Sequence, residues 1–493
     1  MNSVLPARAP RADADRRAVW AIAVLCFSSL CAALMQSLVI PIQSELPELL
    51  GTTASNASWV LTATLLGGAI SMPLAGRLAD LYGKKPVLVC TAALLVVGSL
   101  VCAVSDSLGF VLAGRVLQGM AMGYIPVAIS LVREIAPRHL VNTAVAGVSA
   151  TLGVGGALGL PLAAWVAQNN DWHMLFWISA GLAAVMLTLT ALLVPHVHDA
   201  HPGRVDWLGA AGLAVGLVSV LVGISKGKDW GWGSATTIGM IGGGVVVLLV
   251  WGWYQLRHHD PLVDLRTMAQ RPVLLTNLAG LLIGFGMMAQ SIVVPQLLQM
   301  PTATGYGLGQ TILQAGLWMA PGGLMMMAFA PVSAKLLTDL GARVTLAIGA
   351  FVLAGGYLTA VFLTNAPWEL LLASCIASAG VGIGYAAMPT LILSNVPDEA
   401  AASSVGVNSL MRSVGTTIAG AVMAVVLTSR TMTLGPVEIP THDAFRLCFL
   451  IGAVAAAVGA AVVLLIPRDR GSSSTDTVEA AGFELEQELV TSP

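Results

Sequence analysis

The stretch from Pro73 to Lys85 reads P-L-A-G-R-L-A-D-L-Y-G-K-K. It carries one acid and three cations, and it lies between two apolar runs, 57–75 and 86–104. Each run is close to the length of about 20 residues at which a helix crosses a bilayer. We therefore predict that the stretch is a short polar link at a membrane surface between two spanning helices.

The composition of the whole chain supports a membrane protein. Of its 493 residues, 56% are hydrophobic and 10% are charged, whereas soluble proteins carry about 25% charged residues. The net charge of −2 leaves no basic excess for binding phosphates. These figures exclude a soluble enzyme, a disordered chain and a nucleic-acid binder. All six cysteines lie in apolar runs, which favours reduced packing residues over disulfides.

Fourteen apolar runs are long enough to span a membrane. With the N-terminus in the cytoplasm, seventeen of the 23 Lys and Arg residues fall on the cytoplasmic side and four fall outside. The positive-inside rule therefore supports this count, and we expect both termini to be cytoplasmic and the protein to lie in the cytoplasmic membrane. The predicted spans are 18–41, 57–75, 86–104, 108–132, 143–167, 174–195, 207–225, 235–256, 273–298, 310–333, 344–364, 369–393, 401–428 and 444–466.

The sequence contains an internal repeat. From Pro331 to Arg343 it reads P-V-S-A-K-L-L-T-D-L-G-A-R, which repeats the pattern of the opening stretch 258 residues later. A second repeated pattern, at an offset of 261, relates Gly119, Gly123 and Tyr124 to Gly380, Gly384 and Tyr385. A nearly constant offset indicates two homologous halves of six helices each, as in parallel transporter repeats. The spans 207–225 and 235–256 are then an inserted pair.

These stretches resemble motifs of the major facilitator superfamily, in particular of its fourteen-helix drug:proton antiporters. The segment Gly76–Lys85 is similar to the family's cytoplasmic gating motif. One departure lies in span one, where Met35 stands in place of the acid of the family's D-x-T-I-V-N motif. The other similar stretches are Arg115-x-x-Gln118-Gly119, the antiporter-like motif with Gly155, Gly159 and Pro161, Asp171-Trp172-His173 with Phe176-Trp177, and Pro261-Leu262-Val263-Asp264-Leu265.

The resemblance implies an all-α membrane fold of fourteen helices, with two six-helix bundles and an inserted helix pair between them. We expect a cytoplasmic tail at 1–17, a first bundle at 18–195, a linker with two extra transmembrane helices at 196–272, a second bundle at 273–466, and a disordered cytoplasmic tail at 467–493.

Asp80 is the central residue of the gating motif. Its expected partners are Arg77, nearby cations or the N-terminus of a neighbouring helix, where a carboxylate is stabilised. The resemblance implies a lock that holds the two halves in the outward-open state. Gly76 and Gly83 permit close approach and a positive φ. The alternative is a tight turn whose charges only set the topology.

The remaining charged motif residues also have expected places. Lys84 and Lys85 are expected to bind anionic lipid headgroups. Arg115 and Arg412 lie within spans, where a cation normally faces the bundle interior, although Arg115 lies near enough to the outer face for snorkelling to be the alternative. The coupling candidates are therefore Arg115, Gln118, Gly119 and Arg412. In the antiporter-like motif, Gly155, Gly159 and Pro161 favour a bend and close packing.

No acidic residue falls in the middle of a predicted span. A transporter of cationic drugs usually needs a buried carboxylate to replace the hydration of its ligand. We therefore expect neutral or anionic amphipathic substrates. The proton acceptor stays open between Asp80, Glu45, Glu134 and a route through Arg115 with a protonatable substrate.

Polar, aromatic and Met side chains on inward-facing positions are candidates for lining a cavity, because Met offers a soft, adaptable surface. The alternative is polar contact between packed helices. Gln36 and Gln290 are favoured, because the resemblance implies that helices one and seven of the core line the central cavity. The cavity candidates are Met35, Gln36, Gln290, Gln314, Trp318 and Asn408, with Asn277 and Gln296 beside them.

Two histidine-containing loops carry residue types that bind metals. They are His196-x-His198-Asp199-x-His201 and His258-His259-Asp260. We interpret them as solvated linker residues, and we expect no metal and no cofactor. The Gly-rich stretches lack the lysine pattern of a P-loop, so no ATPase is implied.

The first functional hypothesis is a secondary exporter of drug-like amphipathic molecules that works by alternating access. Exchange for protons follows from the resemblance. The alternatives are a transporter of one metabolite, for uptake or export, and a membrane sensor without transport. An enzyme is not expected. The expected partners are a small-molecule substrate, protons and the lipid bilayer, with no nucleic acid, and the expected state is a monomer.

Overall fold

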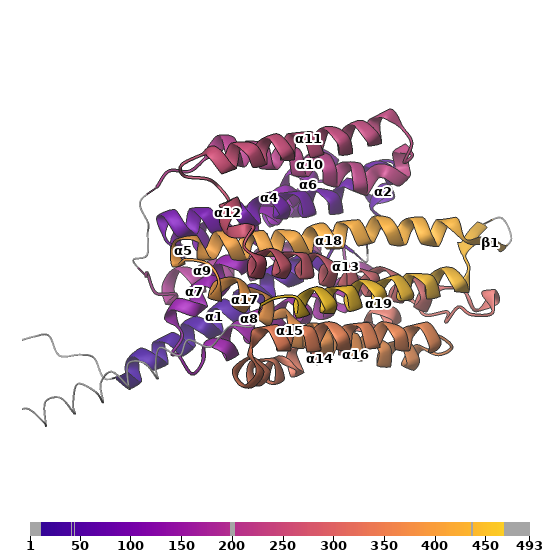
Figure 1. The fold of residues 1–493 in the computed structure, drawn as a ribbon. Helices are drawn as coiled ribbons and strands as arrows, with labels where there is room; N and C mark the ends of the chain where they lie inside the picture. The colour runs from indigo at the N-terminus through magenta and orange to yellow at the C-terminus, as the bar shows by residue number, and fades with distance from the viewer. Residues whose placement is uncertain (1–10, 41, 44, 198–202, 435–436, 468–493) are drawn as a thin grey trace, which may run out of the picture.

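The computed structural model describes residues 11–40, 42–43, 45–197, 203–434 and 437–467. These residues form a bundle of long helices that run roughly along one direction (Figure 1). Helices satisfy their own backbone N–H and C=O groups, which is what hydrocarbon demands of a spanning segment. Thirteen helical segments among the described residues are long and apolar enough to cross a membrane. The predicted all-α membrane fold is confirmed.

The first bundle contains six spans. Its elements are α1 (Arg11–Ser37), α2 (Leu46–Leu49), α3 (Ala54–Ala57), α4 (Trp59–Tyr82), α5 (Lys84–Ala103), α6 (Leu108–Met120), the 3₁₀ turn η1 (Ala121–Gly123), α7 (Tyr124–Ile135), α8 (Val141–Asn169) and α9 (His173–Leu193). Within it α1 packs against α8, and α5 packs against α9.

The inserted pair consists of α10 (Trp207–Trp230) and α11 (Ala235–Arg257), which lie together along one flank of the bundle (Figure 1). The second bundle follows. Its elements are α12 (Leu265–Met268), α13 (Arg271–Gln299), η2 (Thr302–Thr304), α14 (Ile312–Ala328), α15 (Ala330–Phe362), α16 (Pro367–Tyr385), α17 (Ala387–Ser394), η3 (Asp398–Ala400), α18 (Ala401–Ser429), the hairpin β1 (Thr431–Leu434) and β2 (Val437–Pro440), and α19 (His442–Leu464).

One of the thirteen segments contains two spans. The segment Ile312–Phe362 has 51 residues, which corresponds to about 77 Å of helix at about 1.5 Å per residue, far more than a hydrocarbon core of about 30 Å. Gly341 interrupts it with φ 79° and ψ 165°. This left-handed residue ends one span and begins the next, so the described residues provide the fourteen spans that the hydropathy predicts.

The repeat is visible in the backbone as well. Gly83 has φ 91° between α4 and α5, and Gly341 has a positive φ 258 residues later. Spans four and twelve are each interrupted, the first at η1 and the second at Ala386, between α16 and α17. Glycine is used at the two links because a residue with a Cβ is strained there.

Two predicted helix ends differ from the structure. The first helix begins at Arg11 instead of residue 18, so the last part of the predicted polar tail is helical. Helix α10 continues to Trp230 instead of ending at residue 225, and it therefore contains Lys226. The rest of the N-terminal tail, residues 1–10, and the C-terminal tail from residue 468 lie outside the described residues.

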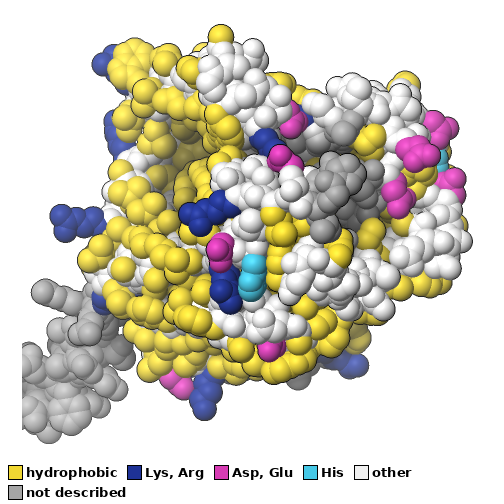
Figure 2. Space-filling view, turned by 90° about the vertical axis from the view of Figure 1, so that its right-hand side faces the viewer, with side chains coloured by type: hydrophobic (Ala, Val, Ile, Leu, Met, Phe, Trp, Pro, Cys, Tyr) yellow, Lys and Arg dark blue, Asp and Glu magenta, His cyan; other side chains and the backbone are white. Residues whose placement is uncertain are grey.

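The two ends of the bundle are named here by one residue each. The Asp80 end is where α4 meets α5, and the Lys226 end is where α10 turns into α11. Figure 2 looks onto the Lys226 end, where hydrophobic side chains cover the left and lower sides of the view and charged side chains are few. This distribution fits a bundle surrounded by lipid.

Candidate functional site

Asp80 joins the two bundles at the Asp80 end. One carboxylate oxygen accepts a hydrogen bond from the backbone N–H of Ala402 at 3.0 Å, and the other accepts from the N–H of Ser403 at 2.9 Å. Both donors lie in the first turn of α18, where N–H groups have no partner in their own helix. Asp80 is 1% exposed. Of the three expected kinds of partner, the N-terminus of a neighbouring helix is the one that binds this carboxylate.

Glycines let α4 and α18 come close enough for this contact. A Cβ atom added to Gly76 would lie 2.4 Å from the carbonyl oxygen of Ala402. A Cβ atom added to Gly406, one turn further along α18, would lie 2.3 Å from the carbonyl oxygen of Met72. Contacts this short do not occur between real atoms, so both positions require glycine. The predicted role of Gly76 in close approach agrees with this crossing.

Two further contacts close the Asp80 end. Asn142, at the start of α8, donates to the hydroxyl of Thr338 in α15 at 3.1 Å. Thr338 stands at the position of the repeat that corresponds to Asp80. Arg133 of α7 donates to the carbonyl oxygen of Leu393 and lies 3.8 Å from Asp398. The two bundles are therefore held together at this end by polar contacts of Asp80, Asn142 and Arg133.

The cations of the motif take different places from those expected. Lys84 is 4% exposed and forms an ion pair with Glu134 of α7. It is therefore not free to bind lipid headgroups, and that prediction is wrong for Lys84, because Glu134 supplies the opposite charge inside the bundle. Lys85 is half-buried. The Nε atom of Arg77 is buried and has no hydrogen-bond partner among the described residues.

A cavity of about 760 Å³ lies between the bundles. It reaches from Met326 and Ser378, in the middle of the bundle, to Gln43 and Gln299 at the Lys226 end. None of the residues that line it carries a charge. The lining residues are Ser37, Ile40, Gln43, Pro47, Ser58, Leu152, Gly153, Gly156, Leu160, Met287, Gln290, Ser291, Ile292, Pro295, Gln296, Gln299, Ile312, Ala315, Gly316, Met319, Gly323, Met326, Ser378 and Val381.

Gln290 and Gln296 are the sequence-derived polar candidates that line this cavity. Gln314 instead forms a capping box with Thr311 at the start of α14, and Trp318 donates to Gln310 at 3.1 Å. The other candidates among the described residues that stand outside the lining are Met35, Gln36, Asn277 and Asn408. Met35 is buried, Gln36 is half-buried, and Asn408 bonds to Asn277.

Gln290 lies where a side chain of α15 bonds to the backbone of α13. Its side-chain amide lies 3.3 Å from the hydroxyl of Ser378 and 3.5 Å from the carbonyl oxygen of Ser374. Its backbone N–H donates to the hydroxyl of Tyr357 at 3.1 Å, and this hydroxyl donates to the carbonyl of Gly286. The tyrosine hydroxyl thus bonds to both members of an i, i−4 pair of backbone groups, the pair that one helical turn brings together.

Arg115 lies inside the first bundle and not at the cavity. It is 1% exposed, and its Nε donates to the carbonyl of Val60 at 3.2 Å. Its guanidinium also donates to Gln118 at 2.7 Å, and Gln118 donates to Ser99 at 2.9 Å. Gly119 lies beside this cluster, where an added Cβ would be 2.2 Å from the carbonyl oxygen of Thr64. This position is internal, so Arg115 does not snorkel.

Arg412 also lies inside its bundle, in α18 of the second half. Its guanidinium donates to the hydroxyl of Tyr385 at 2.9 Å, to Asn408 at 3.0 Å and to Ser409 at 3.1 Å. Among the described residues, no carboxylate is paired with Arg115 or Arg412. The two arginines are held by neutral oxygens, and neither lines the cavity.

The antiporter-like motif joins α8 to two other helices. A Cβ atom added to Gly155 would lie 2.6 Å from the Cβ of Ala33 in α1, and one added to Gly159 would lie 1.9 Å from Oγ of Ser37. Pro161 lies inside α8, close to Gly316 of α14 in the second bundle. The small residues therefore permit close packing of α8 against α1 and α14 beside the cavity.

The histidines do not gather into a metal site among the residues that the structure describes. His258, His259 and Asp260 line a small cavity of about 330 Å³ beside Arg77. His198, Asp199 and His201 lie outside the described residues.

His173 lies at the Lys226 end, between two carboxylates. Its Nδ1 is 2.6 Å from Asp171 and its Nε2 is 3.2 Å from Asp106. Hydrogen bonds from the backbone N–H and the ring of His173 lower the pKa of Asp171 below its ordinary value. These groups link the loops that precede α6 and α9.

Sequence reasoning missed two buried charged residues. Asp206 caps α10 and accepts from Tyr254 at 3.1 Å and from Gln255 at 2.9 Å. Lys226 is 1% exposed, although the hydropathy places it outside the span. Both lie at helix ends, where their partners come from distant parts of the sequence, so hydropathy alone could not find them.

Comparison with known proteins agrees with this geometry. The family model of the Major Facilitator Superfamily matches residues 25–420. A putative multidrug resistance protein MdtD of Yersinia pestis is 26% identical over 92% of this chain and 97% of its own length. A multidrug resistance protein B homolog of Mycobacterium tuberculosis is 27% identical over 77% of this chain and 70% of its own length. An uncharacterized MFS-type transporter of the same organism is 30% identical over 60% of this chain, which spans only 42% of that relative.

Two solved structures share the fold. The human organic anion transporter MFSD10 (TETRAN) superposes with a TM-score of 0.63 at 16% identity, over 91% of this chain and 99% of that one. The proton:xylose symporter XylE, bound to 6-bromo-6-deoxy-D-glucose, superposes with a TM-score of 0.63 at 15% identity, over 92% and 96%. At these identities the likeness concerns the fold alone. Given the family match over most of its length, this chain is a member of the Major Facilitator Superfamily.

Proposed function

We propose that this protein is a secondary exporter of amphipathic small molecules that works by alternating access in exchange for protons. One observation carries the proposal: a cavity without charged lining residues reaches the Lys226 end, while Asp80 and α18 close the opposite end. A closed end and an open end around a central site are what alternating access requires of one conformational state. Two relatives are named as multidrug resistance proteins, which supports the same proposal.

The lining of the cavity favours neutral substrates. Its polar groups are Gln and Ser side chains, and its apolar groups include Met287, Met319 and Met326. Glutamines exchange hydrogen bonds with a ligand without requiring an opposite charge, and methionines adapt to ligands of different shape. The two buried arginines lie outside the lining, which narrows the sequence-based expectation of neutral or anionic substrates toward neutral ones.

The distribution of cations supports a cytoplasmic position for the Asp80 end. The structure then corresponds to the outward-open state, and breaking the contacts of Asp80 would open the cytoplasmic side. Of the candidate proton acceptors, Asp80 and Glu134 lie at this end, and Glu134 is paired with Lys84. Glu45 is exposed at the other end. We assign the coupling to the carboxylates of the Asp80 end, because their protonation would act directly on the contacts between the bundles.

Transport by purified protein in liposomes under an imposed proton gradient tests the function. The probes are Nile red as a neutral dye, an anionic naphthalene sulfonate and the cation ethidium. We expect gradient-driven movement of Nile red, weaker movement of the sulfonate and little movement of ethidium. Strict preference for ethidium would contradict an uncharged site, and movement that ignores the gradient would contradict proton exchange. If all three dyes stay in place while one metabolite moves, the protein is a specific metabolite transporter.

A further inference from the structure

The inserted helices α10 and α11 form one rigid unit. Glycines let them approach closely: a Cβ atom added to Gly216 or Gly223 would lie 2.6 Å from a side chain of α11. At the Asp80 end, Asp206 accepts hydrogen bonds from Tyr254 and Gln255 of α11. Close packing at small residues and satisfied polar groups both resist separation within a membrane. The two helices are therefore expected to move together.

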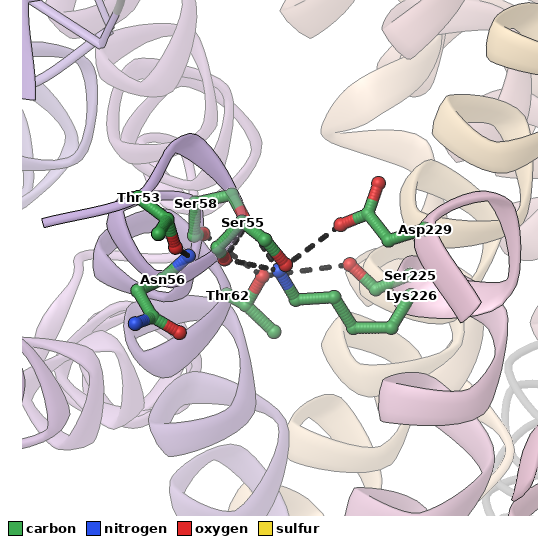
Figure 3. A network of polar contacts seen from close by, with 8 residues as sticks. All are labelled: Thr53, Ser55, Asn56, Ser58, Thr62, Ser225, Lys226 and Asp229. Atoms are coloured by element: carbon green, nitrogen blue, oxygen red, sulfur yellow. Dashed lines mark hydrogen bonds and ion pairs between the residues drawn. The ribbon is translucent and has the colours of Figure 1, made fainter. Parts of the chain in front are cut away.

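Lys226 ties this unit to the first bundle at the Lys226 end (Figure 3). Its Nζ donates to the carbonyl oxygen of Ser55 in α3 at 2.8 Å and to the hydroxyl of Ser58, the residue before α4. It also lies 3.4 Å from Asp229, one turn further along α10. An ammonium group has three N–H donors, and each of them has an oxygen to bond here.

The surroundings of Lys226 make these contacts necessary. The side chain is 2% exposed, and its Nζ lies 5.0 Å from the ring centroid of Trp59. Near it, the hydroxyls of Ser225 and Thr62 lie 3.4 Å apart and form a second link between α10 and α4 (Figure 3). A buried ammonium group without partners is strongly unfavourable, so α10 cannot leave α3 and α4 unless these contacts are replaced.

The contact of the unit with the second bundle is of a different kind. Helix α10 packs against both α4 and α18. Among the described residues, however, no hydrogen bond or ion pair joins α10 or α11 to α18. Sliding of α18 along α10 would break apolar contacts but no hydrogen bond, so it costs less than removing the Lys226 ammonium from its polar contacts.

At the Asp80 end, the inserted pair is connected to the second bundle by the covalent segment between α11 and α13. The backbone N–H of Leu262 donates to Gln255 at 2.9 Å, and Arg266 donates to the carbonyl of Leu256 at 3.1 Å. The segment from there to α13 holds only the four-residue helix α12. Such a short irregular link can bend, whereas the contacts of Lys226 join α10 directly to α3 and to the start of α4.

We propose that Lys226 is a positioning residue that fixes the inserted pair to the first bundle at the cavity mouth, so that the pair moves with this bundle and slides over α18. Ser58 both accepts from Lys226 and lines the cavity, so the tie also sets the shape of its mouth. The movement rests on the proposed alternating access, but the tie itself exists in the state described and can be tested without transport.

The first experiment measures amide hydrogen exchange of the full chain in lipid nanodiscs. In Lys226→Met, we expect amide exchange in residues 53–60 to become about tenfold faster. Exchange requires local opening of this segment, and in the variant that opening no longer has to break the hydrogen bonds of Lys226. Lys228→Met is the matched control, since Lys228 lies two residues further along α10, is exposed and has no partner among the described residues. Exchange in α8 should stay unchanged in both variants. Unchanged exchange at 53–60 in Lys226→Met would overturn the tie.

The second experiment follows distances between spin labels at three exposed positions of the Lys226 end, on a background without the native cysteines. Ser107 reports the first bundle, Gly233 the inserted pair and Ser429 the end of α18. Asp80→Asn is used to shift the protein between states. When the Ser107–Ser429 distance changes, we expect Gly233–Ser429 to change with it and Ser107–Gly233 to stay constant, except in Lys226→Met, where it should broaden.

The outcomes separate the tie from the proposed function. A constant Gly233–Ser429 distance with a changing Ser107–Gly233 distance would mean that the pair follows the second bundle, and would overturn the inference. Changes in both distances would overturn it as well. A Ser107–Ser429 distance that never changes would count against alternating access, and in that case the hydrogen exchange alone decides whether Lys226 holds residues 53–60.

Discussion

Gly76 of α4 lies against the backbone of Ala402 in α18, so closely that an added Cβ would be 2.4 Å from the carbonyl oxygen of Ala402. A helix backbone cannot yield as a flexible side chain can. Gly76→Ala should therefore push the bundles apart at the Asp80 end, at a cost of about 1 to 3 kcal/mol, the range for overpacking. Labelling of Ser403→Cys by a membrane-impermeant maleimide should become faster.

The matched control for this change is Gly181→Ala. Gly181 lies in α9, and no atom lies within 4 Å of the position of its added Cβ. This variant should keep slow labelling at position 403, because alanine is at least as good as glycine in a helix. Equal labelling rates in both variants would show that the crossing at Gly76 does not keep the Asp80 end closed.

Asp80→Asn should abolish export while leaving the abundance of the protein near normal. The substitution removes a full negative charge from the N-terminus of α18, where such a charge contributes about 1 to 2 kcal/mol. The closed Asp80 end then becomes less populated. Transport in liposomes and quantitative immunoblotting measure the two effects. Asp339→Asn, which changes an exposed acid in the second half of the repeat, should leave transport intact; wild-type transport by Asp80→Asn would remove the gating role.

Gln290→Glu places a charge in a cavity whose lining has none. Export of ethidium should rise by about tenfold relative to Nile red, because a carboxylate replaces part of the hydration of a cation at short range. Gln314→Glu introduces the same charge outside the cavity and preserves the capping box of α14. A change of preference in both variants would indicate a general electrostatic effect instead of a local one.

Lys84→Met should lower the thermal stability of the first bundle. It leaves the carboxylate of Glu134 without its ammonium partner, which costs about 1 to 3 kcal/mol, less than for a fully enclosed pair because Glu134 is 24% exposed. Lys85→Met should have a much smaller effect. In a double-mutant cycle measured by thermal unfolding, Glu134→Gln should recover part of the loss; strict additivity would show that the two residues do not interact.

We expect Asp171 to make the stability of the protein depend on pH. Hydrogen bonds from His173 lower the pKa of Asp171 in the folded state, so the stability it contributes is complete above its unfolded pKa of about 4 and is lost as the pH falls through the lower folded pKa. Asp171→Asn should therefore unfold at a lower temperature than wild type at neutral pH, and the difference should vanish in acid. A difference that grows in acid would contradict this.

The fold could be predicted because its signals are local. Gly341 could be identified from the repeat of the pattern around Gly83, and the hydropathy gave fourteen runs. The placement of single charges could not be predicted in the same way. The hydropathy predicts that span seven ends before Lys226, but α10 continues past this residue. Ser55 and Ser58, about 170 residues earlier, supply the oxygens that the buried ammonium group needs. The expected contact of Lys84 with lipid is wrong for the same reason, because its partner Glu134 lies 50 residues away in the sequence.

The candidate site could likewise be predicted only where its signals are local. The dependence of Asp80 on a helix N-terminus follows from the chemistry of a carboxylate, but only the structure identifies α18 as that helix. The resemblance favours Gln36 and Gln290, and of these two Gln290 lines the cavity. Gln314 is a candidate only because its position is expected to face inward, but a Thr three residues before it forms a capping box, which is a local pattern visible in the sequence.

Tyr357 of α15 places its hydroxyl beside the cavity, between the N–H of Gln290 and the carbonyl of Gly286 in α13. In an ordinary helix, bending at such a turn would break a backbone hydrogen bond inside the membrane, where nothing replaces it. Here a side chain from α15 already bonds to both of these backbone groups, so neither is left without a partner if the turn stretches. The cost of bending α13 at the level of the cavity therefore depends on a neighbouring helix as well as on α13 itself.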